Sequence, residues 1–249
     1  MVNFFKTVVY QRILYLFVFI YNIIPGHYIS LVIICLTILV KLVLYPLSKK
    51  SLEGQKALQS LQPKLEEIKK KYVNDKEGLS KAMMDLYRQE KVSPLSSCLP
   101  LLIQLPFFWA IFKVFRDELS GKATTLLYPF IYHPGIMNPI SFGFIDFSKP
   151  NIVLAILAGA SQFAQAKMMP IKQAPVSGEG TKDENMMAAM NRQMLYFMPA
   201  FTVFICWSLP SGLAFYWFIS TLLTILQQWY MFRGDKKSSK DIIEGEIVK

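Results

Sequence analysis

The chain has 249 residues, of which 53% are hydrophobic and 18% charged, and its formal net charge is +10 at pH 7. The apolar residues lie in long blocks, which excludes an intrinsically disordered chain and disfavours an ordinary soluble domain. We therefore predict an all-α integral membrane protein, in which most of the apolar content forms spanning helices.

The first 27 residues contain a twelve-residue apolar run, Ile13 to Ile24, followed by Pro25-Gly26. A spanning helix takes roughly 20 apolar residues, so this run is too short. Tyrosines are interspersed in it, and tyrosine favours the membrane–water boundary. We predict an amphipathic interfacial helix on the outer face within residues 1–27, with a sixth span as the alternative. Because no small-residue cleavage site follows the run, we do not expect a cleaved signal peptide.

Five later segments approach the length of a spanning helix. They are residues 28–48, 96–117, 151–168, 194–209 and 213–232. The last two are separated only by the break around Pro210 and are expected to form a tight helical hairpin. Pro100 and Pro106 indicate that the second span packs within a bundle, where neighbouring helices satisfy the freed carbonyl groups.

Residues 49–95 are mostly polar and connect the first two spans. Apolar residues recur there at three- and four-residue steps in two stripes. The stripes are Leu58, Leu61, Leu65, Ile68 and Tyr72, then Leu79, Met83 and Leu86. We predict two amphipathic helices folded against each other as a cytoplasmic helical hairpin. Its basic residues, among them Lys69, Lys70, Lys71 and Arg88, are candidate contacts for the ribosome, a targeting receptor or anionic lipid; a plain solvated connector is the alternative.

Lysine and arginine are distributed unequally between the predicted sides of the membrane. Residues 48–97, 167–192 and 233–249 hold twenty of them, whereas residues 1–28 and 113–150 hold six. The positive-inside rule therefore predicts an outer N-terminus and a cytoplasmic C-terminus.

This orientation assigns each remaining connection to one side of the membrane. Residues 118–150 are predicted to form an outer-face loop, residues 169–193 a cytoplasmic loop, and residues 233–249 a cytoplasmic tail. The polar, glycine-containing part of the cytoplasmic loop, 171–191, is expected to be mobile.

Lys41 lies inside the first predicted span. A charge at mid-membrane costs about +2.5 to +3.5 kcal/mol, and no Asp or Glu lies within the apolar core of any span to neutralise it. A water-filled cavity would solve this problem; snorkelling of the lysine to the interface is the alternative.

Several other predicted spans carry polar side chains that could face such a cavity. With Lys41, the candidate groove residues are Thr37, Gln104, Gln162, Gln165, Trp217, Ser220, Thr224 and Gln228. Each alone is typical of close helix packing or of interhelical hydrogen bonds. Together they predict a hydrated, positively charged groove that is open to the cytoplasm and closed on the outer side.

The sequence predicts neither a metal site nor a cofactor. Cys35, Cys98 and Cys206 lie in apolar runs without CxxC or Cys/His spacing, and we expect them to be buried as small apolar residues. His27 and His133 lack ligand spacing, so surface or interface roles are expected.

Several short sequences, in order along the chain, also match a known family. They are Tyr45-Pro46-Leu47, Leu61-Gln62-Pro63-Lys64, Lys91-Val92-Ser93-Pro94-Leu95, Cys98-Leu99-Pro100, Phe197-Met198-Pro199, Leu209-Pro210-Ser211-Gly212-Leu213 and Gln227-Gln228. In these residues the chain resembles the YidC membrane protein insertases, which are relatives of the mitochondrial and chloroplast insertases. Lys41 departs from the family, which usually has arginine there; the charge is kept but the bidentate guanidinium is lost.

The resemblance implies a five-span core with a groove that receives hydrophilic parts of nascent membrane proteins in the bacterial inner membrane. It implies that the ribosome, the signal recognition particle and its receptor, a Sec-type translocon and membrane lipids are partners, with no specific nucleic-acid sequence and no cofactor. The protein would act as a chaperone of membrane protein biogenesis and transport, not as an enzyme.

Two other function classes compete with this interpretation. A small-solute or ion transporter could use Lys41 as an intramembrane binding site, although no inverted repeat supports it. A Ser–Lys hydrolase would pair Lys41 with Ser97, Ser161 or Ser220, but none of these serines lies in a nucleophile motif such as GxSxG.

Overall fold

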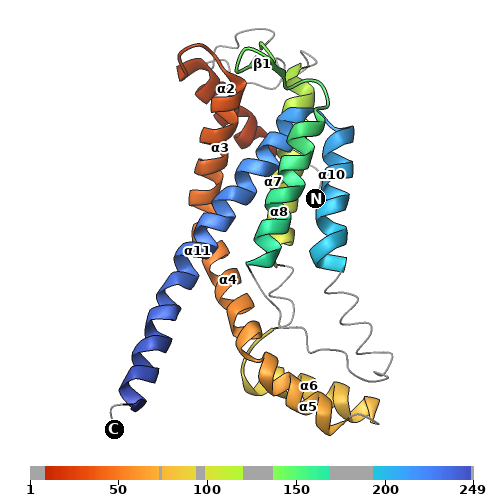
Figure 1. Cartoon of the computed structure of the whole chain (residues 1–249). Helices are drawn as coiled ribbons and strands as arrows, with labels where there is room; N and C mark the ends of the chain where they lie inside the picture. The colour runs from red at the N-terminus through yellow and green to blue at the C-terminus, as the bar shows by residue number, and fades with distance from the viewer. Residues whose placement is uncertain (1–8, 73–74, 94–98, 120–136, 169–192, 248–249) are drawn as a thin grey trace.

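The computed structural model describes residues 9–72, 75–93, 99–119, 137–168 and 193–247 (Figure 1). These residues are mainly helical, as predicted. The helices are α2 (Gln11–Ile23), α3 (Ile29–Val43), α4 (Tyr45–Ser60), α5 (Gln62–Lys71), α6 (Lys76–Gln89), α7 (Leu99–Leu119), α8 (Ile152–Lys167), the π-helical turn η4 (Gln193–Phe197), α10 (Met198–Ser208) and α11 (Ser211–Ile247). The expectations for Ser97, Cys98, His133 and residues 171–191 lie outside the described residues.

Helices α3, α7, α8, α10 and α11 lie side by side as a bundle (Figure 1). Its core contains large side chains from distant parts of the chain, such as Phe17 of α2 and Phe115 of α7, whose rings meet edge to face at 5.5 Å. Large apolar side chains also point outward, including Val43, Phe204 and Trp207. Such an outer surface suits lipid better than water.

No single helix in the described ranges is both long and apolar enough to cross a membrane, whereas α3 and α4 together, bent by 68°, meet that length and composition. The number of spans and their orientation therefore stay predictions.

Helix α2 packs along the bundle through one face. Tyr10, Leu14, Phe17 and Val18 are buried, whereas Phe19 on the opposite face is 55% exposed. The Tyr10 hydroxyl donates to Asp117 Oδ2 at 2.7 Å, which ties the start of α2 to the end of α7. The predicted interfacial helix is thus docked on protein along its apolar stripe.

The first predicted span, 28–48, is not one straight helix. Helix α3 ends at Val43, and the chain bends by 68° before α4 begins at Tyr45. Pro46 is the physical reason, because it has no N–H to donate to the carbonyl of Leu42 and its ring crowds that carbonyl. Lys41 consequently lies in the last turn of α3.

Helices α5 and α6 pack against each other at the end of the molecule opposite β1 (Figure 1). The two predicted stripes meet in a small core of Leu61, Leu65 and Leu86. Asp75 caps α6 by accepting from the Gly78 N–H at 2.9 Å, and Lys64 pairs with Glu90 across the two helices. Such a cap is worth about 1 kcal/mol.

Helix α11 continues to Ile247, beyond Phe232 where the last predicted span ends. The predicted tail therefore begins as helix, because apolar character is not required for helix propagation and no proline interrupts residues 233–247.

The predicted outer-face loop contains a short antiparallel hairpin, β1 (Ile140–Ser141) and β2 (Ile145–Asp146), in which Ile140 pairs with Asp146. Residues 138–149 are anchored to two helix starts. The Ser141 hydroxyl accepts from the Ser30 N–H of α3 at 3.1 Å, and the carbonyls of Lys149 and Phe147 accept from the first N–H groups of α11 at 3.0 and 3.2 Å. These bonds satisfy N–H groups that a helix start leaves without partners.

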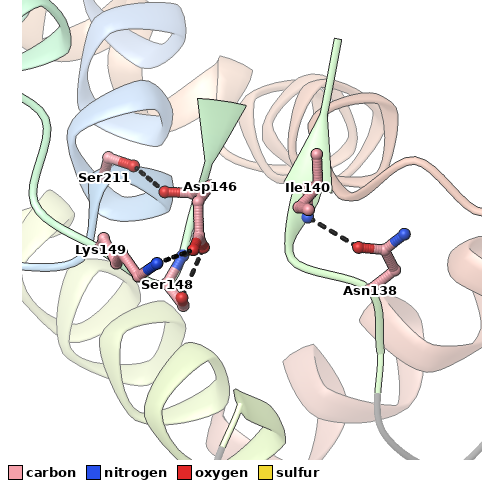
Figure 2. A network of polar contacts seen from close by, with 6 residues as sticks. All are labelled: Asn138, Ile140, Asp146, Ser148, Lys149 and Ser211. Atoms are coloured by element: carbon pink, nitrogen blue, oxygen red, sulfur yellow. Dashed lines mark hydrogen bonds and ion pairs between the residues drawn. The ribbon is translucent and has the colours of Figure 1, made fainter. Parts of the chain in front are cut away.

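The Asp146 carboxylate holds this connection in shape (Figure 2). It accepts from the Ser148 N–H at 2.9 Å and from the Ser148 hydroxyl at 2.5 Å, and it pairs with Lys149 at 3.1 Å, while the Asp146 carbonyl accepts from the Ser211 hydroxyl at 3.0 Å. The hydrogen bond from the Ser148 hydroxyl has the largest effect on the pKa of this carboxyl and lowers it below the ordinary value of 3.8. Lys149 lowers the pKa further, whereas partial desolvation opposes both.

We expect Asp146→Asn to lower the thermal midpoint by about 2 °C near pH 7. A carboxyl with a lowered folded-state pKa stabilises the protein above its unfolded pKa, and this contribution disappears as the pH falls below 3.8 through the folded-state pKa. The variant and the parent should therefore unfold at the same temperature in strong acid. Thermal unfolding in detergent at several pH values measures this; Asp85→Asn, on the hairpin, is the control. A pH-independent difference would contradict the expectation.

Candidate functional site

The Lys41 ammonium joins α3 to α11. Its Nζ donates to Thr224 Oγ1 at 2.8 Å, and the Thr224 hydroxyl donates in turn to the Ser220 carbonyl at 2.9 Å. Among the described residues no carboxylate lies within 4 Å of Nζ. The lysine is therefore held by a neutral hydroxyl and keeps two further N–H donors for another acceptor.

The hydrogen-bonded series continues along one face of α11. Tyr216, Ser220 and Thr224 follow one another at four-residue steps, which places them in line on the helix. The Tyr216 hydroxyl accepts from the Gln104 amide of α7, and one turn further along α11 the Ser220 carbonyl accepts from Thr224. We call Gln104, Tyr216, Ser220, Thr224 and Lys41 the polar seam.

The polar seam is buried at one end and more open at the other. Tyr216 is 2% exposed and Ser220 6% exposed, whereas Lys41 is only partly buried. Buried polar groups that are hydrogen-bonded to one another escape most of the desolvation cost. The seam therefore offers polar partners within a largely apolar bundle.

The other predicted groove residues have different surroundings. The Thr37 hydroxyl donates to the Ile33 carbonyl of its own helix at 2.6 Å, and the Trp217 ring packs edge to face on Phe108 at 5.0 Å. Gln228 is buried on α11, one turn beyond Thr224. In the described structure no hydrogen bond links Gln162 or Gln165 of α8 to Lys41. The complete groove of nine residues stays a prediction.

A pocket of about 240 Å³ opens between α3, α4 and α11, at the bend after Val43. It is lined by Ile38, Lys41, Leu42, Tyr45, Leu223, Gln227 and Tyr230. Lys41 thus belongs both to the polar seam and to the lining of this pocket.

The sequence analysis missed three polar residues of this region: Tyr216 in the seam, and Gln227 and Tyr230 in the pocket. Tyr216 could have been found, because it lies four residues before Ser220 on the stripe that contains Thr224. The pocket could not, because it depends on the angle between α3 and α4.

The predicted basic contacts of the hairpin lie on its surface. Lys69, Lys70 and Lys71 occupy the last turn of α5, where cations interact favourably with the helix dipole. Arg88 is 78% exposed in its side chain and lies 3.8 Å from Asp85. Lys70, Lys71 and Arg88 are exposed and Lys69 is half-buried. An exposed ion pair such as that of Arg88 with Asp85 contributes little to stability.

The other side chains that could react, those of serine, histidine and cysteine, are hydrogen-bonded to backbone carbonyls or lie on a helix without a catalytic partner among the described residues. The Ser161 hydroxyl donates to the Ala158 carbonyl at 2.8 Å, and His27 Nδ1 lies 2.9 Å from the Tyr21 carbonyl. Cys206 is buried as predicted, but Cys35 is exposed, because it lies on the outward face of α3. The described residues include no group of three His, Cys, Asp or Glu that could hold a metal ion.

Comparison with known proteins gives consistent matches. The family model described as 60Kd inner membrane protein matches residues 19–239. A protein of Fusobacterium nucleatum named membrane protein insertase YidC is 36% identical over 201 residues, which cover 81% of this chain and 84% of that protein. Proteins of the same name from Legionella pneumophila and Actinobacillus pleuropneumoniae are 34% and 37% identical, over 85% and 84% of this chain. In both cases the match spans 34% of the relative's length.

Proposed function

Because the chain belongs to the 60Kd inner membrane protein family, we propose that it inserts newly made membrane proteins into the bacterial inner membrane. The predicted resemblance to the YidC insertases and the predicted inner-membrane localisation are confirmed by these relatives. The family is one of insertases and not of enzymes.

The observation that carries the proposal is the polar seam that connects Gln104 of α7 to Lys41 of α3 through α11. A client segment that must cross the membrane contains polar groups, each of which costs several kcal/mol in hydrocarbon when unsatisfied. The seam would supply hydrogen-bond partners partway across. Lys41, with its two remaining donors, would attract an acidic group of the client.

Release would follow when the apolar part of the client moves into lipid. Partition of roughly 20 apolar residues into the bilayer supplies the driving force, so the step needs no nucleotide.

The same proposal includes the orientation of the chain in the membrane and the partners that it meets on the cytoplasmic side. Five spans with a cytoplasmic C-terminus would place the hairpin α5–α6 and the end of α11 on the side where ribosomes work. Lys69, Lys70, Lys71 and Arg88 would then meet the ribosome, the signal recognition particle with its receptor, or anionic lipid, and a Sec-type translocon would be a further partner.

The test is insertion by the full chain in liposomes. A client with a short acidic outer tail is synthesised in vitro, and protection of the tail from added protease reports insertion. We expect protection to exceed clearly that in protein-free liposomes. Flux of a small anionic dye is measured in the same liposomes, because the competing transporter would move the dye. Dye flux without client protection would overturn the insertase proposal.

A further inference from the structure

The pocket between α3, α4 and α11 contains more hydrogen-bond donors than the protein uses. Lys41 gives one N–H to Thr224 and keeps two, and the buried Gln227 Nε2 has no partner among the described residues. The hydroxyls of Tyr45 and Tyr230 can donate as well. An occupant must therefore supply acceptors, and a negative charge is favoured beside the ammonium.

The remaining walls of the pocket are apolar and face outward. Ile38, Leu42 and Leu223 complete the lining, and Leu42 is 67% exposed on the surface of α3. An occupant that enters from this side needs an apolar part as well as an anionic head. A small soluble anion would leave these side chains without a partner.

The pocket lies at the bend where α3 ends, at the cytoplasmic end of the first predicted span. Lys41 is in the last turn of α3, and Tyr45 begins α4 directly after the bend. Lysine and tyrosine at the end of a membrane helix are typical of the headgroup region.

We propose that this pocket binds one anionic phospholipid, with its phosphate between Lys41 and Gln227 and an acyl chain along Ile38 and Leu42. The proposal rests on the membrane placement in the proposed function but not on insertion activity. The bound lipid would accept hydrogen bonds from the donors of Lys41 and Gln227 that have no partner in the protein. It would also hold α3 against α11 next to the polar seam.

Native mass spectrometry of the full chain in detergent tests this, with phosphatidylglycerol and phosphatidylcholine added separately. We expect the anionic lipid to bind about tenfold more tightly, since both lipids carry a phosphate but only phosphatidylglycerol has a net negative charge to place beside the Lys41 ammonium. Lys41→Met and Gln227→Leu should each remove most of the preference. Tyr230→Phe, at a residue 74% exposed and therefore safe for folding, should reduce it by about twofold.

Two controls match these changes outside the pocket. Lys50→Met removes an exposed cation from α4, and Gln89→Leu removes an exposed amide from α6; both should keep the preference. Equal binding of the two lipids, an unchanged preference in Lys41→Met and Gln227→Leu, or an equal loss in Lys50→Met would overturn the proposal. Displacement of the lipid by inorganic phosphate alone would also overturn it, because the acyl chain would then contribute nothing.

The lipid experiment contains no client, so it is independent of the insertion assay. A chain that fails to insert clients but prefers the anionic lipid would refute the proposed function and leave this site standing. A chain that inserts clients without any lipid preference would do the reverse.

Discussion

Lys41→Glu is expected to lower insertion of a client with an acidic outer tail by about tenfold or more, a loss that corresponds to at least 1.4 kcal/mol. The ammonium at this position lies 2.8 Å from Thr224 and has no carboxylate among the described residues within 4 Å. No carboxylate of the described residues therefore competes with an arriving acid for this ammonium. At an effective dielectric constant near 20, two unit charges 4 Å apart interact by about 4 kcal/mol, so reversing the sign should have a large effect.

The series of substitutions separates charge from shape. Lys41→Arg keeps the charge and should insert the client at close to the parent rate, whereas Lys41→Ala should fall between the parent and Lys41→Glu. Lys50→Glu makes the same charge reversal on the exposed surface of α4 and should have little effect. Thermal unfolding of each purified variant checks that the bundle is intact.

A second client identifies the partner of the lysine. When the acidic residues of its tail are replaced by their amides, the difference between parent and Lys41→Glu should shrink severalfold, because a neutral tail gains little from the ammonium. Equal insertion of the acidic client by the parent, Lys41→Ala and Lys41→Glu would contradict the electrostatic part of the mechanism.

The sequence predicted a helix well where the spacing of its apolar residues alone indicates it. The stripes through Leu61, Leu65 and Leu86 predicted that two amphipathic helices would face each other, and these residues form the small core of the hairpin. Asn151, the first residue of the third predicted span, caps α8 by accepting from the Val153 and Leu154 N–H groups, although the sequence analysis did not single it out as a cap. Such signals lie within a few residues of the structure they specify.

The ends of the helices were harder to predict, because proline, hydropathy and helix propensity indicate different end points. Pro46 bends the chain near Leu44, but the apolar run continues through Leu47 and conceals the break. At the other end, α11 continues past Phe232 because charged residues propagate a helix although they end a hydropathy segment. Hydropathy therefore located membrane-like segments, not helix boundaries.

The site itself was partly predictable. The sequence analysis singled out Lys41, Ser220, Thr224 and Gln104 because polar side chains in apolar runs require partners. Which of them meet depends on helix rotation and crossing, which one sequence does not determine; the seam consequently includes Tyr216 and no residue of α8. The hydrogen bond from the Ser30 N–H to the Ser141 hydroxyl joins residues 111 positions apart and has no local signal.

Gly159→Leu is expected to separate α8 from α10 and to destabilise the bundle by several kcal/mol. A Cβ atom at Gly159 would lie 2.3 Å from Val203 Cγ2 and 2.9 Å from the Pro199 carbonyl oxygen. The side chain of Val203 could shift, but the Pro199 carbonyl belongs to the backbone of α10. Small residues at such crossings let membrane helices approach closely, and here the glycine is that residue.

The sign of the effect distinguishes packing from helix propensity. Propensity alone would make Gly159→Ala more stable by about 1 kcal/mol, whereas the close approach of α10 predicts a loss of about 1–3 kcal/mol. Ala160→Leu, one residue along and exposed, adds the same side chain on the outward face and should unfold close to the parent. Equilibrium unfolding in detergent compares the variants. If Gly159→Ala were more stable than the parent, or if the two leucine variants unfolded alike, the contact between α8 and α10 would not limit the stability of the bundle.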